Sequence, residues 1–340
     1  MKRIHQEQRS TFKMRLLLSI VFFSFCSVSY ALKSAENQDI VRAAANIKLA
    51  VPVTSPSNQC TKLAKGTGLP NVLLGFQRTF FDDFNKLDLS AKGWAPFFDG
   101  GFDEETHTWI GYDDPNKRTL KGNKEQQIYV DQEYTGASEQ SLNLNPFFIK
   151  EGVLNIVAQR TPASLQKSLY GYQYYSGLIT TRKSFAQRYG YFEMRAKLPE
   201  GKAIWPAFWL LPVDKSWPPE LDIVELVGQQ PDLIVTTAHW GESLANYQSS
   251  GCRTQLTSAT KSFHLYGAYW QPKKVTFYID RQPIAEIATP DAMNKPMYML
   301  LNLAIGGKMV GVADQETPVP AKFEIDWVAA YQLKEFGAIN

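Results

Sequence analysis

The stretch that most constrains the fold is Glu-Leu-Asp-Ile-Val-Glu at 220–225, in which three carboxylates are interleaved with aliphatic residues. This composition predicts a β-strand, where successive side chains point to opposite faces of a sheet. Strict alternation places Glu220 and Asp222 on one face and Glu225 on the other. One extra residue, a β-bulge at Ile223–Val224, would return Glu225 to the first face. We therefore predict a bulged strand that presents all three acids to one cleft.

Three acids on one face are costly, because like charges a few ångströms apart resist simultaneous ionisation. A solvated strand edge normally mixes acids with basic and polar residues, so a structural role explains the pattern poorly. Retaining glycoside hydrolysis explains it well, since it needs a nucleophilic and a protonated carboxyl group about 5–5.5 Å apart. The acid between them can hydrogen bond to the nucleophile and keep the two pKa values apart. Leu221 and one of the two bulge residues are expected to face the core.

From Arg78 the chain consists of short β-rich runs separated by Gly, Pro and Asn, and hardly any stretch has helical periodicity. This pattern predicts an all-β sandwich. A chain of 340 residues that is 44% hydrophobic can bury one substantial core, and its length does not require a second domain. The clearest predicted strands are 152–158, 189–198, 235–240, 263–270 and 275–279.

The acidic motif, together with Trp-Pro-Ala-Phe-Trp-Leu-Leu-Pro at 205–212, resembles glycoside hydrolase family 16, in the bulged-motif branch that includes laminarinase-type enzymes. The similarity extends from about residue 81 to residue 332. It implies a concanavalin-like jelly-roll β-sandwich with a concave substrate-binding cleft. It also assigns Glu220 as the nucleophile, Asp222 as an assisting acid and Glu225 as the general acid/base. The residues alone do not decide the order of the two glutamates.

The resemblance also implies a set of substrate-binding residues around the acids. Trp205 and Trp217 flank the acidic strand, where an aromatic ring can stack on a sugar. His239 is expected on the neighbouring strand, where it could hydrogen bond to a sugar hydroxyl or to Asp222. No metal-binding triad is evident among the histidines, so metal-assisted hydrolysis is disfavoured. The remaining candidates are polar residues for which a turn or surface role is the alternative: Asn123, Glu125, Arg182 and Asn302.

The N-terminus has the pattern of a signal peptide over residues 1–31, with basic residues, a short apolar run and the cleavage site Ser29-Tyr30-Ala31. An uncleaved membrane anchor is the alternative. Residues 32–75 are expected to form a tail or linker, and residues 76–335 the catalytic domain. We predict a secreted or periplasmic protein, in which Cys60 and Cys252 either pair or remain free thiols.

The net charge of +3, without a basic cluster, argues against nucleic acid as a partner. A polysaccharide is the expected partner, with no stable membrane insertion after signal cleavage, and the chain is expected to be a monomer. Catalysis should need no cofactor. The resemblance implies one structural calcium ion, for which Asp326 is the matching carboxylate.

These features predict a retaining endo-β-glycanase that hydrolyses a β-1,3 or mixed β-1,3/1,4 glucan or a related bacterial exopolysaccharide. A non-catalytic carbohydrate-binding protein of the same fold is one alternative. Non-catalytic relatives generally lose one or both glutamates, whereas this chain keeps Glu220 and Glu225. A transglycosylase, in which an acceptor sugar replaces water, is the other. Departures from the family pattern at 200–203 and 228–232 leave the linkage open.

Overall fold

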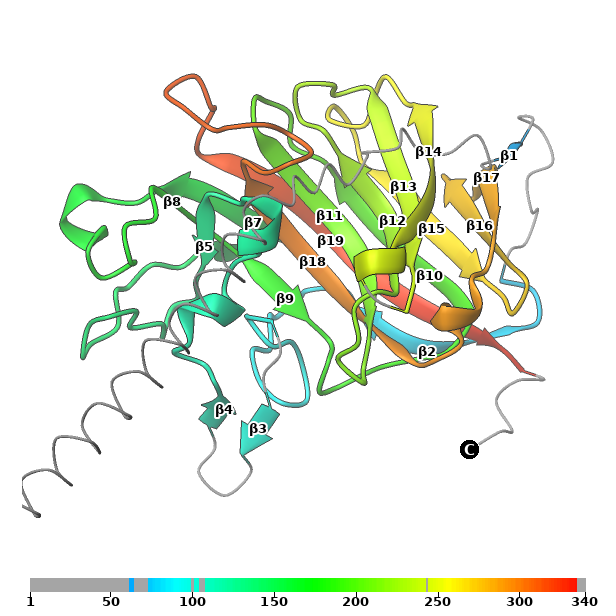
Figure 1. Ribbon diagram of the computed structural model, residues 1–340, viewed down its shortest axis with the longest axis horizontal. Helices are drawn as coiled ribbons and strands as arrows, with labels where there is room; N and C mark the ends of the chain where they lie inside the picture. The colour runs from blue at the N-terminus through cyan, green and yellow to red at the C-terminus, as the bar shows by residue number, and fades with distance from the viewer. Residues whose placement is uncertain (1–60, 64–72, 99–100, 104–107, 243, 335–340) are drawn as a thin grey trace, which may run out of the picture. The chain divides into compact units, whose positions relative to one another are not determined.

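A computed structural model of the chain describes residues 61–63, 73–98, 101–103, 108–242 and 244–334. Nearly all regular structure in these residues is β, which confirms the predicted all-β class (Figure 1). The described strands form two large sheets and one small hairpin, β3 (Gly101–Asp103) with β4 (Thr108–Ile110). The described helical residues form single 3-10 turns: η1 (Pro115–Lys117), η2 (Lys121–Asn123), η3 (Ala163–Leu165), η4 (Leu244–Asn246) and η5 (Asp291–Met293).

The larger sheet forms one layer of the sandwich. Its strands, in spatial order, are β1 (Thr61–Lys62), β17 (Gln282–Ala288), β16 (Lys274–Ile279), β15 (His264–Trp270), β10 (Gly190–Lys197), β19 (Ala321–Leu333), β7 (Val153–Arg160), β8 (Tyr174–Ser176) and β5 (Gln127–Tyr129). Two further strands pair with members of this series: β2 (Phe76–Asp82) with β19, and β6 (Phe147–Lys150) with β7.

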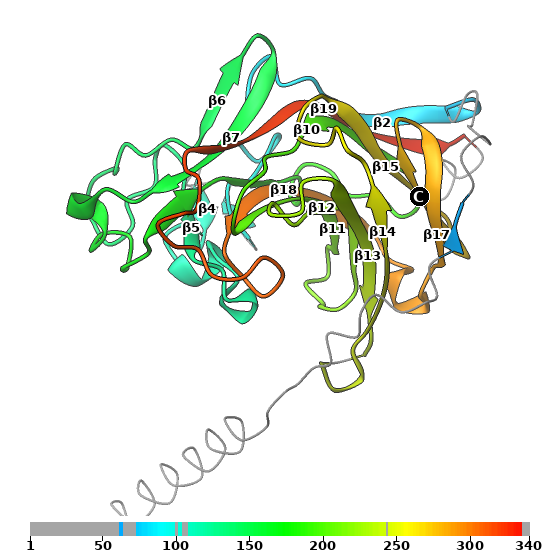
Figure 2. The ribbon, with the colours of Figure 1, turned by 90° about the horizontal axis from the view of Figure 1, so that it is seen from above.

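The smaller sheet forms the second layer and carries the acidic motif. Its strands are β14 (Gln248–Gln255), β13 (Leu233–Trp240), β12 (Glu220–Leu226), β11 (Ile204–Pro212), β18 (Met297–Ile305) and β9 (Leu178–Thr180). All described pairings within this sheet are antiparallel. Figure 2 shows the two layers one above the other, with β10 and β19 facing β11, β12 and β18.

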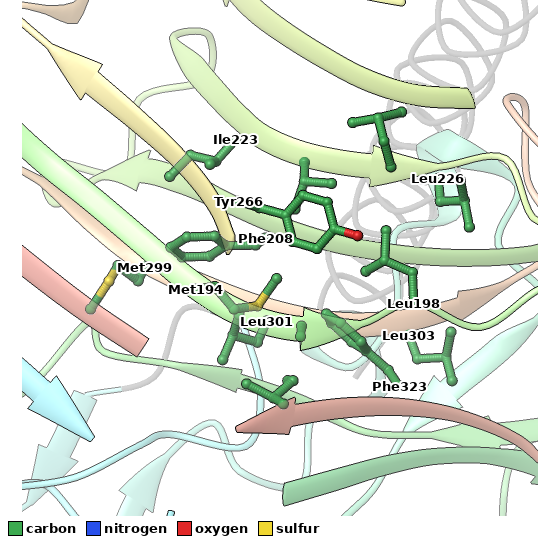
Figure 3. Packing of buried hydrophobic residues seen from close by; sticks show 14 of the residues in the cluster. Met194, Leu198, Phe208, Ile223, Leu226, Tyr266, Met299, Leu301, Leu303 and Phe323 are labelled. Atoms are coloured by element: carbon green, nitrogen blue, oxygen red, sulfur yellow. The ribbon is translucent and has the colours of Figure 1, made fainter. Parts of the chain in front are cut away.

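The main core fills the space between the two sheets, where alternate residues of each strand meet (Figure 3). Phe208 and Leu301 from the smaller sheet pack with Met194 and Phe323 from the larger one, and all four are fully buried. Burial of each such side chain is worth about 1.5–3 kcal/mol. Because strand side chains alternate, filling the core with one set of residues leaves the other set to line the opposite face of the smaller sheet.

The five strand ranges predicted from the sequence agree to within one or two residues with the bounds of β7, β10, β13, β15 and β16. Strand β1 lies within the segment predicted to be a linker and pairs with β17. Cys252 on β14 is in a disulfide. Of the two alternatives for this cysteine, the structure therefore has the paired one. Cys60, the candidate partner, and the predicted signal peptide lie outside the described residues. Within the described residues, no helix has the length and apolar character needed to cross a membrane.

Candidate active site

Strand β12 contains the bulge that the acidic motif predicted. Asp222 and Glu225 are three positions apart, but their partners on β13, Thr237 and Val235, are only two apart. The pairing of β12 with β11 shifts at the same point. This extra residue returns Glu225 to the face that holds Glu220 and Asp222. The smaller sheet therefore presents all three acids on the side away from the main core.

One detail of the bulge prediction was wrong. Ile223 and Val224 both lie in the main core, with 2% and 1% of their surface exposed, although only one was expected there. At a bulge, two consecutive residues lie opposite one partner residue, so strict alternation is lost between them. Both aliphatic side chains can then leave the sheet on the core side, which anchors the bulge by hydrophobic burial.

Each glutamate is held at one oxygen by an indole N–H. Trp217 Nε1 donates to Glu220 Oε2 at 2.6 Å, and Trp205 Nε1 donates to Glu225 Oε1 at 2.9 Å. An indole has only one donor, so each tryptophan restrains a single carboxylate oxygen. Glu220 Oε1 and Glu225 Oε2 are not used by these two bonds.

Asp222, the central acid, forms a hydrogen bond with a histidine of the neighbouring strand. His239 lies opposite Glu220 on β13, and its Nε2 is 2.7 Å from Asp222 Oδ2 and 4.0 Å from Glu220 Oε1. The other ring nitrogen, Nδ1, hydrogen bonds to the hydroxyl of Tyr247. Asp222 and Glu220 also share a side-chain hydrogen bond, which requires a proton on one of the two carboxyls. Of the two partners predicted for His239, the structure provides Asp222.

Burial dominates the electrostatics of the three acids. Desolvation, followed by the charge of Asp222, raises the pKa of Glu220 to about 8. Desolvation, followed by the charge of Glu225, raises the pKa of Asp222 well above its ordinary value. Desolvation also raises the pKa of Glu225 to about 7, although His239 and the Trp205 hydrogen bond oppose the rise. The cluster therefore retains protons near neutral pH. In the substrate-free site Glu220 holds a proton at least as strongly as Glu225, so Glu220 must lose it before it can act as a nucleophile.

A second polar network joins three predicted substrate residues. Glu125 accepts from Gln127 Nε2 at 2.7 Å and from Asn123 Nδ2 at 3.4 Å. The Tyr129 hydroxyl donates to Glu125 Oε2 at 3.4 Å and accepts from Asn302 Nδ2 at 3.0 Å. Burial raises the pKa of Glu125 to about 7. These contacts bring Asn123, Glu125 and Asn302 into one network.

The second network connects to the sheet of the acids. Trp209 Nε1 donates to Asn302 Oδ1 at 2.7 Å, and Trp209 lies opposite Asp222 in the pairing of β11 with β12. Asn302 lies opposite Ala207 on β11. Trp209 belongs to a second apolar cluster with Tyr298, distinct from the main core. The network therefore adjoins the face that carries the acids.

Arg182 lies just beyond strand β9, at the edge of the smaller sheet. Its guanidinium is 5.5 Å from the ring centroid of Tyr298. Tyr298 is on β18 and is buried. The structure thus places Arg182 beside β9, three strands away from β12, with β18 and β11 between them.

Two groups of residues bear on metal binding: two acids of β12 with His239, and Asp326. Ligand atoms of Glu220, Asp222 and His239 lie within 4.8 Å of one another, a spacing that a divalent ion could bridge. Hydrogen bonds among these residues and from Trp217 already account for this spacing. The Asp326 carboxylate forms an ion pair with Arg195, so it fits a calcium site poorly. Calcium at Asp326 stays a prediction from the resemblance, which this ion pair does not support.

The main residue that sequence reasoning missed is Tyr247. Its ring stacks on Trp217 with centroids 5.8 Å apart and on His239 with centroids 5.7 Å apart. It lies between η4 and β14, in a connection without periodicity. The available signal was an isolated aromatic residue eight positions after His239, which does not by itself indicate a site.

Comparison with known proteins identifies the family. The model for glycosyl hydrolases family 16 matches residues 150–329, which is 180 of the 340 residues. The chain belongs to this family. Strands β7 to β19, with the bulged acidic motif of β12, lie in or overlap the matched region. The predicted family is confirmed.

Individual relatives also support the assignment to this family. Endo-1,3-1,4-beta-glycanase EglC of Rhizobium meliloti (strain 1021) is 42% identical over 265 residues, covering 75% of this chain and 52% of EglC. The chain thus spans about half the length of that relative. The laminarinase catalytic domain of Thermotoga maritima MSB8 is 27% identical with a TM-score of 0.60, covering 76% of this chain and 98% of the other. Laminarinase from Flavobacterium sp. UMI-01 is 30% identical with a TM-score of 0.55, covering 75% and 100%. The jelly-roll prediction is confirmed.

Proposed function

We propose that the chain is a retaining endo-β-glycanase that hydrolyses a β-1,3 or mixed β-1,3/1,4 glucan or a related bacterial exopolysaccharide. The observation that carries this proposal is the placement of Glu220 and Glu225 on one face of the bulged strand, each held at one oxygen by an indole N–H. Retaining hydrolysis requires two carboxyl groups beside the scissile bond. The names of EglC, an endo-1,3-1,4-β-glycanase, and of the two laminarinases support this substrate class.

The hydrogen bonds favour particular atoms for each step. Glu220 Oε1 would attack the anomeric carbon, because Oε2 is held by Trp217. Glu225 would give the proton on its Oε2 to the leaving oxygen, because Oε1 accepts from Trp205. The glycosidic bond breaks as an ester between Glu220 and the sugar forms. Glu225, now a carboxylate, then takes a proton from water, and the water oxygen displaces Glu220 from the sugar.

The predicted binding residues differ in how well they are placed to contact a sugar. The Trp217 side chain is 48% exposed, so its ring can stack on a sugar while its N–H holds Glu220. Asn123, Glu125 and Asn302 are proposed to contact substrate through their shared network. Arg182, at the sheet edge, would bind only a longer chain of sugars.

The decisive test is digestion of a polysaccharide panel by wild type and Glu220→Gln, with products resolved by size. The panel holds laminarin, barley mixed-linkage glucan, agarose, carrageenan and a bacterial exopolysaccharide. Oligosaccharides that appear from one substrate only with wild type support the proposal and give the linkage. In a second digest that starts from oligosaccharides of the cleaved substrate, products longer than the starting oligosaccharides would favour transglycosylation. Binding without products would favour a non-catalytic carbohydrate-binding protein.

Export and assembly are proposed on sequence grounds. Residues 1–31 would be removed as a signal peptide, giving a secreted or periplasmic monomer. N-terminal sequencing of the protein recovered from the periplasm or medium tests the cleavage site. Recovery of an uncleaved, membrane-bound chain would support the anchor alternative instead.

A further inference from the structure

Tyr247 contacts two side chains that each hold a catalytic carboxylate. Its ring stacks on Trp217, the donor to Glu220, and its hydroxyl hydrogen bonds to Nδ1 of His239, whose Nε2 lies beside Asp222. We propose that Tyr247 is a positioning residue that donates its hydroxyl proton to His239 and thereby directs a chain of hydrogen bonds toward Glu220. This role rests on the proposed function of Glu220 as the nucleophile.

The chain of hydrogen bonds can run in two directions. If Tyr247 donates to Nδ1, the proton of the imidazole is on Nε2 and points at Asp222. Asp222 can then carry its own proton toward Glu220, and Glu220 is the carboxylate. If Tyr247 accepts instead, Nδ1 carries a proton, and Nε2 either accepts the Asp222 proton or belongs to an imidazolium that stabilises the Asp222 anion. In both of these states Asp222 no longer donates to Glu220, and the nucleophile is less available.

The surroundings of Tyr247 favour the donating direction. Burial raises the pKa of Tyr247 to about 12, although a hydrogen bond from the Ser249 side chain to the phenol oxygen opposes the rise. Because this oxygen already accepts from Ser249, the hydroxyl proton of Tyr247 is directed at Nδ1 of His239. The titratable groups that face His239 are the three acids of β12 and Tyr247 itself. Trp217 adds a further donor to Glu220. All of these donors then point toward the same carboxylate.

A glycine in the turn between β13 and β14 allows Tyr247 to lie next to His239. Gly241, directly after β13, has φ +143, a conformation that side chains with a Cβ rarely adopt. A Cβ at this position would lie 2.8 Å from the Asn246 carbonyl oxygen and 3.1 Å from the Tyr247 Cα. Glycine thus lets the end of β13 approach the start of β14 closely. This close approach brings Tyr247 next to His239.

The first test is Tyr247→Phe, which keeps the ring and removes the hydroxyl. We expect kcat to fall about 3- to 10-fold, the loss of one neutral hydrogen bond, with KM changed less than about 2-fold. The acidic limb of the kcat–pH profile should move to higher pH, because Glu220 loses its directed donor. Tyr189→Phe is the matched control, since its hydroxyl donates to Asn294 at 2.8 Å, and both limbs should stay in place.

The second test asks whether Tyr247 acts through His239. In a His239→Gln background, which has no ring tautomer, Tyr247→Phe should have almost no further effect on kcat. Full additivity, or a Tyr247→Phe effect confined to KM, would overturn the proposal.

Nitrogen-15 NMR of the histidine side chains gives a readout that needs no activity. Nδ1 of His239 should appear as an unprotonated acceptor in wild type and lose that signature in Tyr247→Phe. A wild type that shows the expected tautomer but cleaves no polysaccharide would contradict the proposed function while leaving the tyrosine–histidine contact intact. A wild type in which Nδ1 carries the proton would contradict the role of Tyr247.

Discussion

Replacement of Trp205 by Phe should raise the pKa of Glu225 and move the basic limb of the pH–activity profile upward. The Trp205 N–H donates to Glu225 Oε1 at 2.9 Å, and this bond favours the charged carboxylate over the acid. A hydrogen bond to a charged group is worth about 1.5–3 kcal/mol, and one pKa unit corresponds to about 1.36 kcal/mol. Removal of the bond should therefore raise the pKa of Glu225 from about 7 by roughly 1–2 units.

The assay is kcat/KM for a mixed-linkage oligosaccharide between pH 4 and pH 10, because this profile reports the essential acid and base of the free enzyme. Trp209→Phe is the matched control: it removes the same indole N–H from the same strand, but this N–H donates to the neutral Asn302 amide at 2.7 Å. The control should leave the basic limb in place. An unchanged or lowered basic limb in Trp205→Phe would refute the assignment of Glu225 as the acid held by Trp205.

Two further predictions concern Glu225. Glu225→Ala should lose most hydrolysis, and azide should partly restore turnover of a substrate with a good leaving group by attacking the glycosyl-enzyme; no glycosyl azide product would argue against the acid/base role. Glu225→Gln should stabilise the fold at pH 8 by about 1–3 kcal/mol, since folding raises the pKa of Glu225 to about 7. Ionisation then costs the folded state stability from the unfolded pKa of about 4.3 up to the folded value. The gain should vanish at pH 4, and equal urea denaturation at both pH values would contradict it.

The bulged strand was predictable because its signal is local. Three acids at positions 220, 222 and 225 fit one face only if a residue is added between the last two, and the pairing of β12 confirms this. The spacing of the acids does not predict to which face of the sheet the side chain of the added residue is directed. Ile223 and Val224 are both buried because backbone geometry at the bulge, and not alternation, sets their direction.

Contacts between distant segments were harder to predict. Asp326 was matched to a calcium site from its place in the last strand, but it forms an ion pair with Arg195. The pairing of β10 with β19 shifts between Arg195 and Ala196, so the two charges meet at an irregularity that no single-strand pattern encodes. Tyr247 was missed for a related reason, since its position depends on how the chain turns between β13 and β14.

The two flanking tryptophans explain why substitutions at this site need care. Trp205 and Trp217 were predicted as platforms for sugar rings, and the structure shows that their N–H groups also restrain Glu225 and Glu220. Replacement by alanine removes the ring and the donor together, so a loss of activity could arise from weaker binding or from a displaced carboxylate. Replacement by phenylalanine keeps an aromatic face and removes only the donor. A change in the pH profile with little change in KM therefore isolates the restraint on the carboxylate from the contact with substrate.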